Sequence, residues 1–223
     1  MSEMRLIPII AIDGPTASGK GTVAQKVAHK LKFNYLDSGS LYRLVGLVSK
    51  ELGVSFSQES QLYDIAKNLP VHFDGEKIFY KNQDVSDLIR TEEMGLRASA
   101  VGAIQAVRQG LYDFQRSFLT TPGLVADGRD MTTVIFPEAQ LKVFLTADVA
   151  IRAERRYKQL IAKGISANIL VLTQDLEERD ARDIERTASP LTLATGAKML
   201  DTSHLTVEQA VRQILGWYEL TEL

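Results

Sequence analysis

The stretch that decides the fold of this chain is Gly14-Pro15-Thr16-Ala17-Ser18-Gly19-Lys20-Gly21-Thr22. It follows the apolar run Leu6–Asp13 and fits the pattern G-x-x-x-x-G-K of loops that bind phosphate groups. Its glycines let successive backbone N–H groups turn inward around an oligophosphate, and Lys20 can reach the β and γ phosphates. A helix that begins in this loop points its positive end at the same phosphates. A strand, this loop and a helix therefore predict a binding site for a nucleoside triphosphate.

The rest of the chain alternates short apolar runs with helix-length amphipathic segments, which is typical of a parallel sheet covered by helices. Five predicted strands lie at Leu6–Asp13, Phe33–Leu36, Leu124–Asp127, Leu141–Leu145 and Lys198–Asp201. Helical periodicity predicts helices at 21–31 and 41–52, and the capping-box sequence Thr206-Val207-Glu208-Gln209 begins another. We therefore expect a three-layer α/β/α fold with a five-stranded parallel core sheet.

Two regions break this alternation. Residues 71–80 have the pattern of a β-hairpin with Asp74-Gly75 in its turn, inside the segment 62–99, which does not read as a crossover helix. Residues 148–186 are helical in pattern and rich in arginine, with an interruption at 164–168. We expect a core made of residues 1–61 and 100–223 and a small α+β insertion at 62–99.

Composition narrows the class of protein. The chain has 223 residues, a formal net charge of −2, no cysteine and three scattered histidines without metal-ligand spacing. This charge gives no general attraction to nucleic acid or to an anionic membrane, and no apolar run approaches the roughly 20 residues of a membrane span. The first residues do not have the pattern of a signal peptide. We expect a cytoplasmic monomer that binds small molecules, with neither nucleic acid nor membrane as a partner.

The phosphate loop departs from the common form at one position. Gly21 stands where Ser or Thr usually follows the lysine, and Thr22 comes one residue later. G-K-G-T is a form found in small-molecule phosphoryl-transfer enzymes, whereas regulatory GTPases also need an N-K-x-D sequence that reads guanine. The nearest string, Lys81-Asn82-Gln83-Asp84, has a different order. The ligation of Mg²⁺ stays open between Thr22 and water together with another side chain.

Two polar segments follow predicted strands at the carboxyl edge of the sheet, where open α/β folds bind ligands. They are Asp37-Ser38-Gly39-Ser40-Leu41-Tyr42-Arg43 and Asp127-Gly128-Arg129-Asp130. Alone, the first would be a helix cap with a solvated arginine and the second a turn. Beside a phosphate loop, both are expected to line the site. Asp127 then has the place of the acidic residue that holds Mg²⁺ directly or through water.

The helical region 148–186 has six arginines: Arg152, Arg155, Arg156, Arg179, Arg182 and Arg186. Acidic residues are interleaved with them, so ion pairs on a solvated helix face explain most of these arginines. A γ-phosphoryl transfer concentrates negative charge, however, and arginines that close over the phosphates neutralise it and exclude water. We expect at least two of the six to be catalytic.

In these motifs the chain resembles the bacterial cytidylate (CMP) kinases, a family of P-loop nucleoside monophosphate kinases. The shared motifs cover nearly the whole chain: I-A-I-D-G-P ending at Pro15, L-D-S-G-S-L-Y-R at 36–43, A-D-G-R-D at 126–130, E-R-D-A-R-D-I-E-R at 178–186 and L-D-T-S at 200–203. The resemblance implies Mg²⁺- and ATP-dependent phosphorylation of CMP and dCMP to CDP and dCDP, in pyrimidine metabolism. It also implies that 62–99 binds the monophosphate and that 148–165 forms a lid.

The resemblance further implies roles for individual residues. ATP is assigned to Gly14–Thr22, and Mg²⁺ to Thr22 and Asp127. The phosphate and ribose of CMP are assigned to Ser38, Tyr42, Arg43, Arg129, Arg179, Asp183 and Arg186, and its base to Ser99, Arg108 and Asp130. Catalysis is assigned to Lys20, Asp127, Arg155, Arg156 and Arg179. Two departures from the family pattern are Thr132, at a position that is commonly glycine, and Thr16-Ala17 in the loop; we expect the first to affect only local loop geometry.

The chemistry of cytosine agrees with the base assignment. Asp130 or Ser99 can accept a hydrogen bond from the 4-amino group, while Arg108 donates to the ring acceptors. Uracil would leave Asp130 facing a carbonyl oxygen, and a buried mismatch of this kind supports strong discrimination.

Three alternatives remain. The chain could phosphorylate another small acceptor, such as UMP, AMP, a sugar or a shikimate-like molecule. It could instead be a nucleotide-sensing module, which would hydrolyse ATP slowly and show no acceptor-stimulated ADP release. A nucleic-acid-binding protein would show strongly salt-dependent binding, which the net charge of −2 disfavours.

Overall fold

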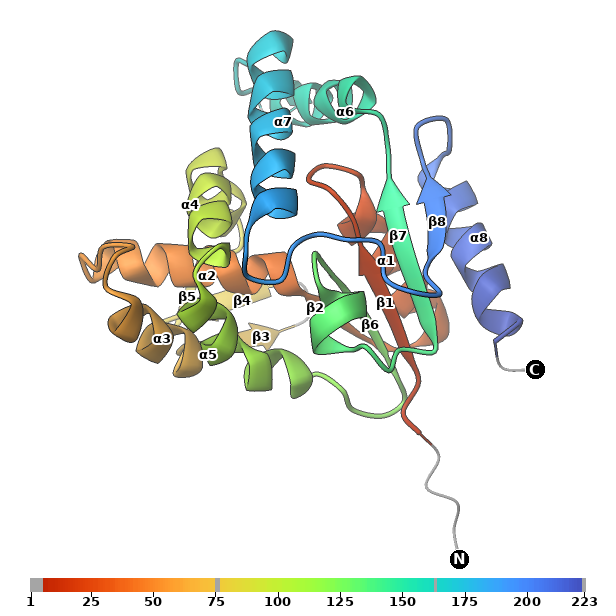
Figure 1. The fold of residues 1–223 in the computed structure, drawn as a ribbon. Helices are drawn as coiled ribbons and strands as arrows, with labels where there is room; N and C mark the ends of the chain where they lie inside the picture. The colour runs from red at the N-terminus through yellow and green to blue at the C-terminus, as the bar shows by residue number, and fades with distance from the viewer. Residues whose placement is uncertain (1–5, 75–76, 163, 222–223) are drawn as a thin grey trace, which may run out of the picture. The chain divides into compact units, whose positions relative to one another are not determined.

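The computed structural model describes residues 6–74, 77–162 and 164–221. The chain divides into two compact units: residues 1–36 with 118–223, and residues 37–117. Gly75, expected in the hairpin turn, lies outside the described residues. Figure 1 shows the order of the helices and strands along the chain.

The first unit is built on a five-stranded sheet in the order β2-β6-β1-β7-β8. The strands are β1 (Ile9–Asp13), β2 (Asn34–Asp37), β6 (Leu124–Gly128), β7 (Leu141–Thr146) and β8 (Lys198–Asp201). Strand β1 pairs in parallel with β6 and β7, and β7 pairs in parallel with β8. All five residues of β1 are buried, as expected for a central strand that carries side chains on both faces of a covered sheet. The three-layer α/β/α fold class predicted from the sequence is confirmed.

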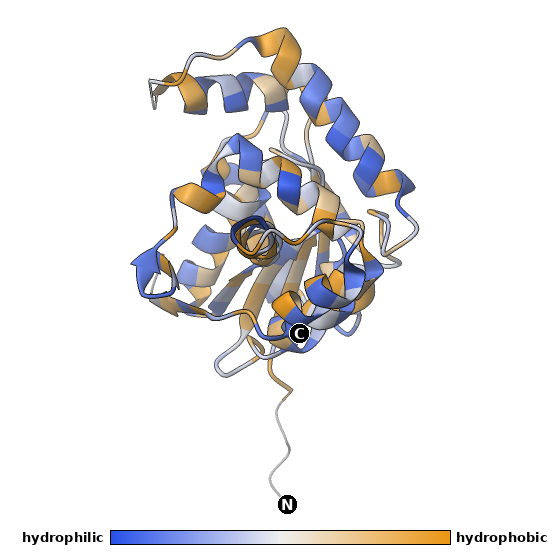
Figure 2. Cartoon of the chain, turned by 90° about the vertical axis from the view of Figure 1, so that its left-hand side faces the viewer, coloured by the Kyte–Doolittle hydropathy of each residue, from blue (hydrophilic) through white to orange (hydrophobic). Residues whose placement is uncertain are grey.

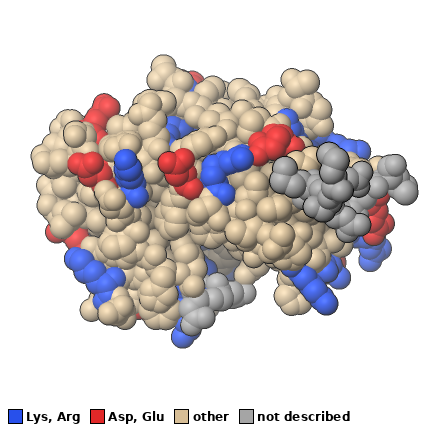
Figure 3. Space-filling view, turned by 90° about the horizontal axis from the view of Figure 1, so that it is seen from below, with Lys and Arg blue, Asp and Glu red and all other residues tan. Residues whose placement is uncertain are grey.

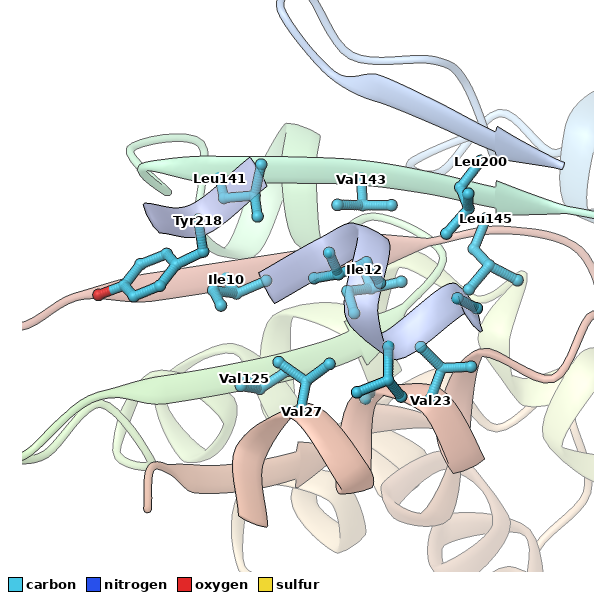
Figure 4. Packing of buried hydrophobic residues seen from close by; sticks show 14 of the residues in the cluster. Ile10, Ile12, Val23, Val27, Val125, Leu141, Val143, Leu145, Leu200 and Tyr218 are labelled. Atoms are coloured by element: carbon cyan, nitrogen blue, oxygen red, sulfur yellow. The ribbon is translucent and has the colours of Figure 1, made fainter. Parts of the chain in front are cut away.

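Helices α1 (Lys20–Leu31) and α8 (Val207–Glu219) pack on one face of this sheet. Val23 and Val27 of α1 and Ile214 of α8 meet Ile10, Ile12, Val125 and Val143 of the strands in one hydrophobic cluster (Figure 4). Helix α8 begins with the predicted capping box, in which the Thr206 hydroxyl accepts from the N–H of Gln209. This packing fixes the end of β1, from which the phosphate loop continues.

Helices α6 (Val149–Ala162) and α7 (Ile169–Glu185) form most of the arginine-rich region 148–186 and pack against each other. Asn168 caps α7 by accepting from the N–H of Leu170, so the predicted interruption at 164–168 separates two helices. Between β6 and β7 lies a π-helical turn, η2 (Met131–Ile135), that the sequence pattern did not predict.

The second unit combines four helices with a small antiparallel sheet. The helices are α2 (Ser38–Glu51), α3 (Glu59–Lys67), α4 (Glu92–Gly102) and α5 (Gln105–Arg116), with a short 3-10 turn, η1 (Leu88–Arg90). Strands β3 (Val71–Asp74), β4 (Lys77–Tyr80) and β5 (Gln83–Asp84) form the sheet, which includes the predicted hairpin. Gly110 lets α5 approach α3 closely, because a Cβ there would lie 2.8 Å from the Cβ of Ala66. This unit contains the segment 62–99, expected as an insertion, together with α2 and α5; those domain boundaries stay a prediction.

Most boundaries differ from the predicted ones by one to three residues. Helix α2 begins at Ser38 because the carboxylate of Asp37 accepts from the N–H of Ser40 and caps it. In Figure 2 the helices carry hydrophobic and hydrophilic residues in alternation, as amphipathic helices do. The face shown in Figure 3 has basic and acidic side chains interspersed rather than gathered by sign. Within the described ranges, no helix is long and apolar enough to cross a membrane.

Candidate active site

The phosphate loop runs from the end of β1 to the first residue of α1. Gly14 passes so close to β7 that a Cβ there would lie 2.0 Å from the carbonyl oxygen of Leu145, so only glycine fits. Ala17 and Gly19 have φ angles of 59° and 90°, in the left-handed region that turns a loop sharply. The Lys20 ammonium folds back over the loop and donates to the carbonyl of Pro15 at 3.3 Å. The Ser18 hydroxyl is buried and has no hydrogen-bond partner among the described residues. The loop is therefore compact, with a cation and a buried hydroxyl in it.

Thr16 connects this loop to three other segments of the first unit. Its N–H donates to Oδ1 of Asp180 at 3.3 Å, and its carbonyl accepts from Arg152 at 3.0 Å. Its hydroxyl accepts from Nη2 of Arg129 at 2.9 Å. Arg152 and Asp180 form an ion pair with an N–O distance of 2.6 Å, and only 7% and 15% of their side chains are exposed. Helices α6 and α7 are thus tied to the loop by a buried pair that the sequence pattern did not single out.

Asp183 lies among cations. Its Oδ2 accepts from Nε of Arg129 at 2.7 Å, and its Oδ1 accepts from Nη1 of Arg186 at 3.4 Å. Burial alone would raise the pKa of Asp183, but Arg129, Arg186 and, at longer range, Lys20 outweigh it and lower this pKa. Burial likewise opposes the charge of Arg129, yet the carboxylate of Asp183 keeps the pKa of this arginine raised. Arg129 also interacts with the carboxylates of Asp127 and Asp180, so three carboxylates and three cations gather here. The arginine guanidinium groups among them are suited to bind a phosphorylated ligand.

The residues predicted to bind Mg²⁺ lie beside the first turn of α1. Asp127, in β6, is buried and accepts from the hydroxyl of Tyr35 at 2.7 Å. Gly21 lies next to it, since a Cβ on Gly21 would be 4.0 Å from each carboxylate oxygen of Asp127. Thr22, the next residue of the helix, is exposed. Within the described ranges, no group of three or more acidic, histidine or cysteine residues could hold a metal. A single carboxylate and a hydroxyl nevertheless fit Mg²⁺, which proteins usually hold with one or two carboxylates, water and the phosphates of the substrate.

The lid arginines have different contacts. Arg155 donates from Nη1 to the carbonyl of Ser18 at 3.4 Å and to the hydroxyl of Thr202 at 3.2 Å. Arg156 donates to the side chain of Gln159 on its own helix at 3.3 Å. Arg179 is half-buried on α7. The fold therefore brings Arg155 against the phosphate loop.

Five predicted acceptor residues belong to the second unit. The Arg108 guanidinium lies 5.4 Å from the ring centroid of Tyr42 and donates to the carbonyl of Gly102 at 2.8 Å. Arg43 donates to the carbonyl of Ile89 at 2.7 Å. Ser38 is buried at the start of α2. The Ser99 hydroxyl is buried without a hydrogen-bond partner in the described part of the chain. This unit brings together Tyr42 and Arg108 from helices α2 and α5.

Sequence reasoning missed four residues of the first unit that contact predicted site residues or the residues next to them: Asp13, Tyr35, Asp180 and Thr202. Asp13 accepts from two backbone N–H groups directly after Asp130. Asp180 and Thr202 lie inside the motifs at 178–186 and 200–203. Their position in these motifs could have identified them as site residues. Asp13 and Tyr35 lie within predicted strands and gave no comparable signal.

The glycine-rich loop runs from the central strand of a parallel sheet into a helix, with a lysine over it and the buried Arg152 and half-buried Arg129 and Arg155 around it. These features define a P-loop protein that binds a phosphorylated nucleotide. Comparison with known proteins narrows this class. The family model "Cytidylate kinase" matches residues 10–220, so the chain belongs to the cytidylate kinase family.

Relatives named "Cytidylate kinase" are similar over nearly their whole length. The protein of Polynucleobacter asymbioticus is 58% identical over 216 residues, covering 97% of this chain and 98% of the relative. That of Cupriavidus necator is 58% identical over 215 residues, covering 96% and 97%. That of Chromobacterium violaceum is 52% identical over 213 residues, covering 96% of each.

Proposed function

We propose that this member of the cytidylate kinase family transfers the γ-phosphoryl group of ATP to CMP, and also to dCMP, forming CDP and dCDP. Family membership over residues 10–220 supports this activity. The structural observation that best supports this activity is the arrangement of Lys20, Arg129 and Arg186 around Asp183. Arg155 contacts the phosphate loop in the same unit. We expect the reaction to take place in the cytoplasm, on small-molecule substrates and in a monomer.

The donor half of the reaction is assigned to the loop Gly14–Thr22. The loop N–H groups and the N-terminus of α1 bind the triphosphate, and Lys20 neutralises charge on its β and γ phosphates. Bound Mg²⁺, held by Asp127 and Thr22 directly or through water, supplies further positive charge at the transferring group. Tyr35 fixes the carboxylate of Asp127 through its 2.7 Å hydrogen bond. Arg155 then adds positive charge at the loop itself.

The acceptor half is assigned residue by residue, as the family resemblance implies. The guanidinium groups of Arg43, Arg129 and Arg186 hold the phosphate of CMP, together with Ser38 and Tyr42. Arg179 and Asp183 contact the ribose side. An acceptor phosphate oxygen attacks the γ-phosphorus in line and ADP leaves, so no covalent intermediate with the enzyme forms.

The cytosine base is assigned to Ser99, Arg108 and Asp130. The buried hydroxyl of Ser99 supports this assignment, because it has no hydrogen-bond partner among the described residues and can therefore bond to a ligand. Arg108 supplies donors, and Asp130, which is 1% exposed, supplies acceptors for the 4-amino group. Uracil would place its 4-carbonyl oxygen, which can only accept hydrogen bonds, against the carboxylate oxygens of Asp130.

ADP release measured with CMP, dCMP, UMP, AMP and shikimate as acceptors tests this function. We expect CMP and dCMP to stimulate ADP release strongly and the other acceptors weakly. Turnover of UMP equal to that of CMP would contradict the base assignment. Slow ATP hydrolysis that no acceptor stimulates would favour a nucleotide-sensing module instead.

A further inference from the structure

Asp13 joins the phosphate loop to the segment that follows β6. It is the last residue of β1, it is 0% exposed, and Gly14 of the loop comes directly after it. Its backbone is in register with Gly128, the last residue of β6. One residue therefore fixes both the start of the loop and the residue before Arg129.

The side chain of Asp13 holds the chain on the other side of Asp130. Its Oδ1 accepts from the N–H of Met131 at 2.9 Å. Its Oδ2 accepts from the N–H of Thr132 at 2.8 Å and from the Thr132 hydroxyl at 2.5 Å. Three donors on one buried carboxylate make a rigid attachment, because charge-assisted hydrogen bonds are roughly twice as strong as neutral ones.

Arg129 and Asp130 lie between these two attachments. Gly128 is held by the strand pairing, and Met131 and Thr132 are held by the carboxylate. The carbonyl of Asp130 accepts from the N–H groups of Val134 and Ile135 at 2.9 and 3.1 Å, which fixes the start of η2. The backbone of Asp130 thus has little freedom to move relative to the loop.

This arrangement is electrostatically costly. Burial raises the pKa of Asp13, and the nearby charge of Asp130 raises it further, while the donors of Thr132 and Met131 lower it in part. A buried carboxylate beside a second buried carboxylate opposes folding unless its donors offset the cost. The donors of Thr132 and Met131 offset part of this cost, so the carboxylate of Asp13 depends on the segment that follows Asp130.

We propose that Asp13 is a positioning residue for recognition of the acceptor base, acting through Thr132 and the backbone to hold the side chain of Asp130. This inference rests on the proposed function, since it requires Asp130 to contact cytosine. The Thr132 hydroxyl belongs to the attachment: it supplies one of the three hydrogen bonds that keep the carboxylate of Asp13 in place.

Thr132→Val tests the inference, because it removes the hydroxyl and nearly keeps the side-chain volume. We expect the ratio of kcat/KM for CMP to kcat/KM for UMP to fall about threefold to tenfold, the usual effect of one lost hydrogen bond. The KM for ATP should stay within about twofold of the wild-type value. Thr132→Ser, which keeps the hydroxyl, should keep the wild-type ratio of kcat/KM for CMP to kcat/KM for UMP.

Thr133→Val is the matched control, since the neighbouring Thr133 hydroxyl is buried and has no hydrogen-bond partner among the described residues. This variant should keep the wild-type ratio. An unchanged ratio in Thr132→Val, or an equal fall in Thr132→Ser and Thr133→Val, would overturn the inference.

Asp130→Asn separates this inference from the proposed function. If Asp130→Asn lowers the CMP-to-UMP ratio and Thr132→Val does not, only the role of Asp13 fails. If Asp130→Asn leaves the ratio unchanged, the base assignment itself fails. In the double variant, Thr132→Val should add no further loss to Asp130→Asn, and additive losses would show that Thr132 does not act through Asp130.

Discussion

The Nε atom of Arg129 donates to Oδ2 of Asp183 at 2.7 Å, and this ion pair joins the end of β6 to helix α7. Only 21% of the Arg129 side chain and 10% of the Asp183 side chain are exposed. The pair lies in the candidate active site, so it affects both the stability and the charge of the acceptor phosphate pocket that we propose.

Asp183→Asn should destabilise the protein in a pH-dependent way. Because the pKa of Asp183 is lowered in the folded state, its ionised form stabilises the fold above the ordinary carboxyl pKa of about 3.9. This stabilisation is lost as the pH falls through the folded-state value. We expect a loss of about 3 kcal/mol near neutral pH, typical of breaking a buried pair, and a shrinking difference from wild type below about pH 4.

Thermal unfolding at several pH values checks this prediction. Asp175→Asn is the matched control, because Asp175 is exposed on the same helix and its substitution should cost no more than about 0.5 kcal/mol. A wild-type-to-Asp183→Asn difference that stays constant between about pH 7 and pH 3 would contradict the assignment of the stabilising charge.

Lys20→Ala should lower kcat by about 100-fold or more, because it removes a preorganised cation from the transferring phosphate. The fold should persist, as seen in an unchanged far-UV circular dichroism spectrum. Lys26→Ala on the same helix is the control, since Lys26 is exposed and pairs with Glu208 at 3.0 Å. A near-normal rate for Lys20→Ala would refute the role of the phosphate loop.

Arg155→Met should lower kcat more than Arg156→Met. Arg155 already contacts the carbonyl of Ser18 in the loop, whereas Arg156 contacts Gln159 on its own helix. We expect a loss of about 100-fold for Arg155→Met, the order found when one charge-stabilising donor is removed. Steady-state kinetics with saturating ATP and CMP measure both variants, and the opposite order of losses would contradict the prediction.

Arg152→Met should destabilise the protein by about 3 kcal/mol, because it leaves the carboxylate of Asp180 buried without its cation. The double variant Arg152→Met/Asp180→Leu should recover part of this loss, because it removes the unpaired carboxylate but also removes the hydrogen bonds of both side chains to Thr16. Lys158→Met breaks the exposed pair with Glu154 on the same helix and should cost less than about 1 kcal/mol. Urea unfolding compares them, and equal losses for Arg152→Met and Lys158→Met would show that the buried pair adds nothing.

Much of the fold could be predicted from the sequence because local patterns determine it. The apolar runs at β1, β6, β7 and β8 predicted the strands of the core, and the capping box at Thr206 predicted where α8 begins. The hairpin of β3 and β4 followed from its alternating pattern. These signals are short in range, so they need no knowledge of the tertiary structure.

The connections inside the candidate site could not be predicted in this way. Asp180 contacts Thr16 across 164 residues of sequence, and Asp13 contacts Met131 across 118. Arg152 and Asp180 looked like members of a solvated, charge-laced helix, but helix packing buries them together. Thr132 was expected to alter only the local loop, yet its hydroxyl donates to Asp13 at the start of the phosphate loop. The assignments of individual residues to ATP, CMP and Mg²⁺ stay predictions.

The most direct test of the central claim is the identity and rate of the product formed from ATP with CMP and with UMP, separated by ion-exchange chromatography. The account predicts CDP formation with a kcat/KM for CMP at least about 100-fold above that for UMP, as expected when a buried polar group meets the wrong base. Equal formation of CDP and UDP would contradict the base-reading site, and no CDP at all would contradict the proposed function.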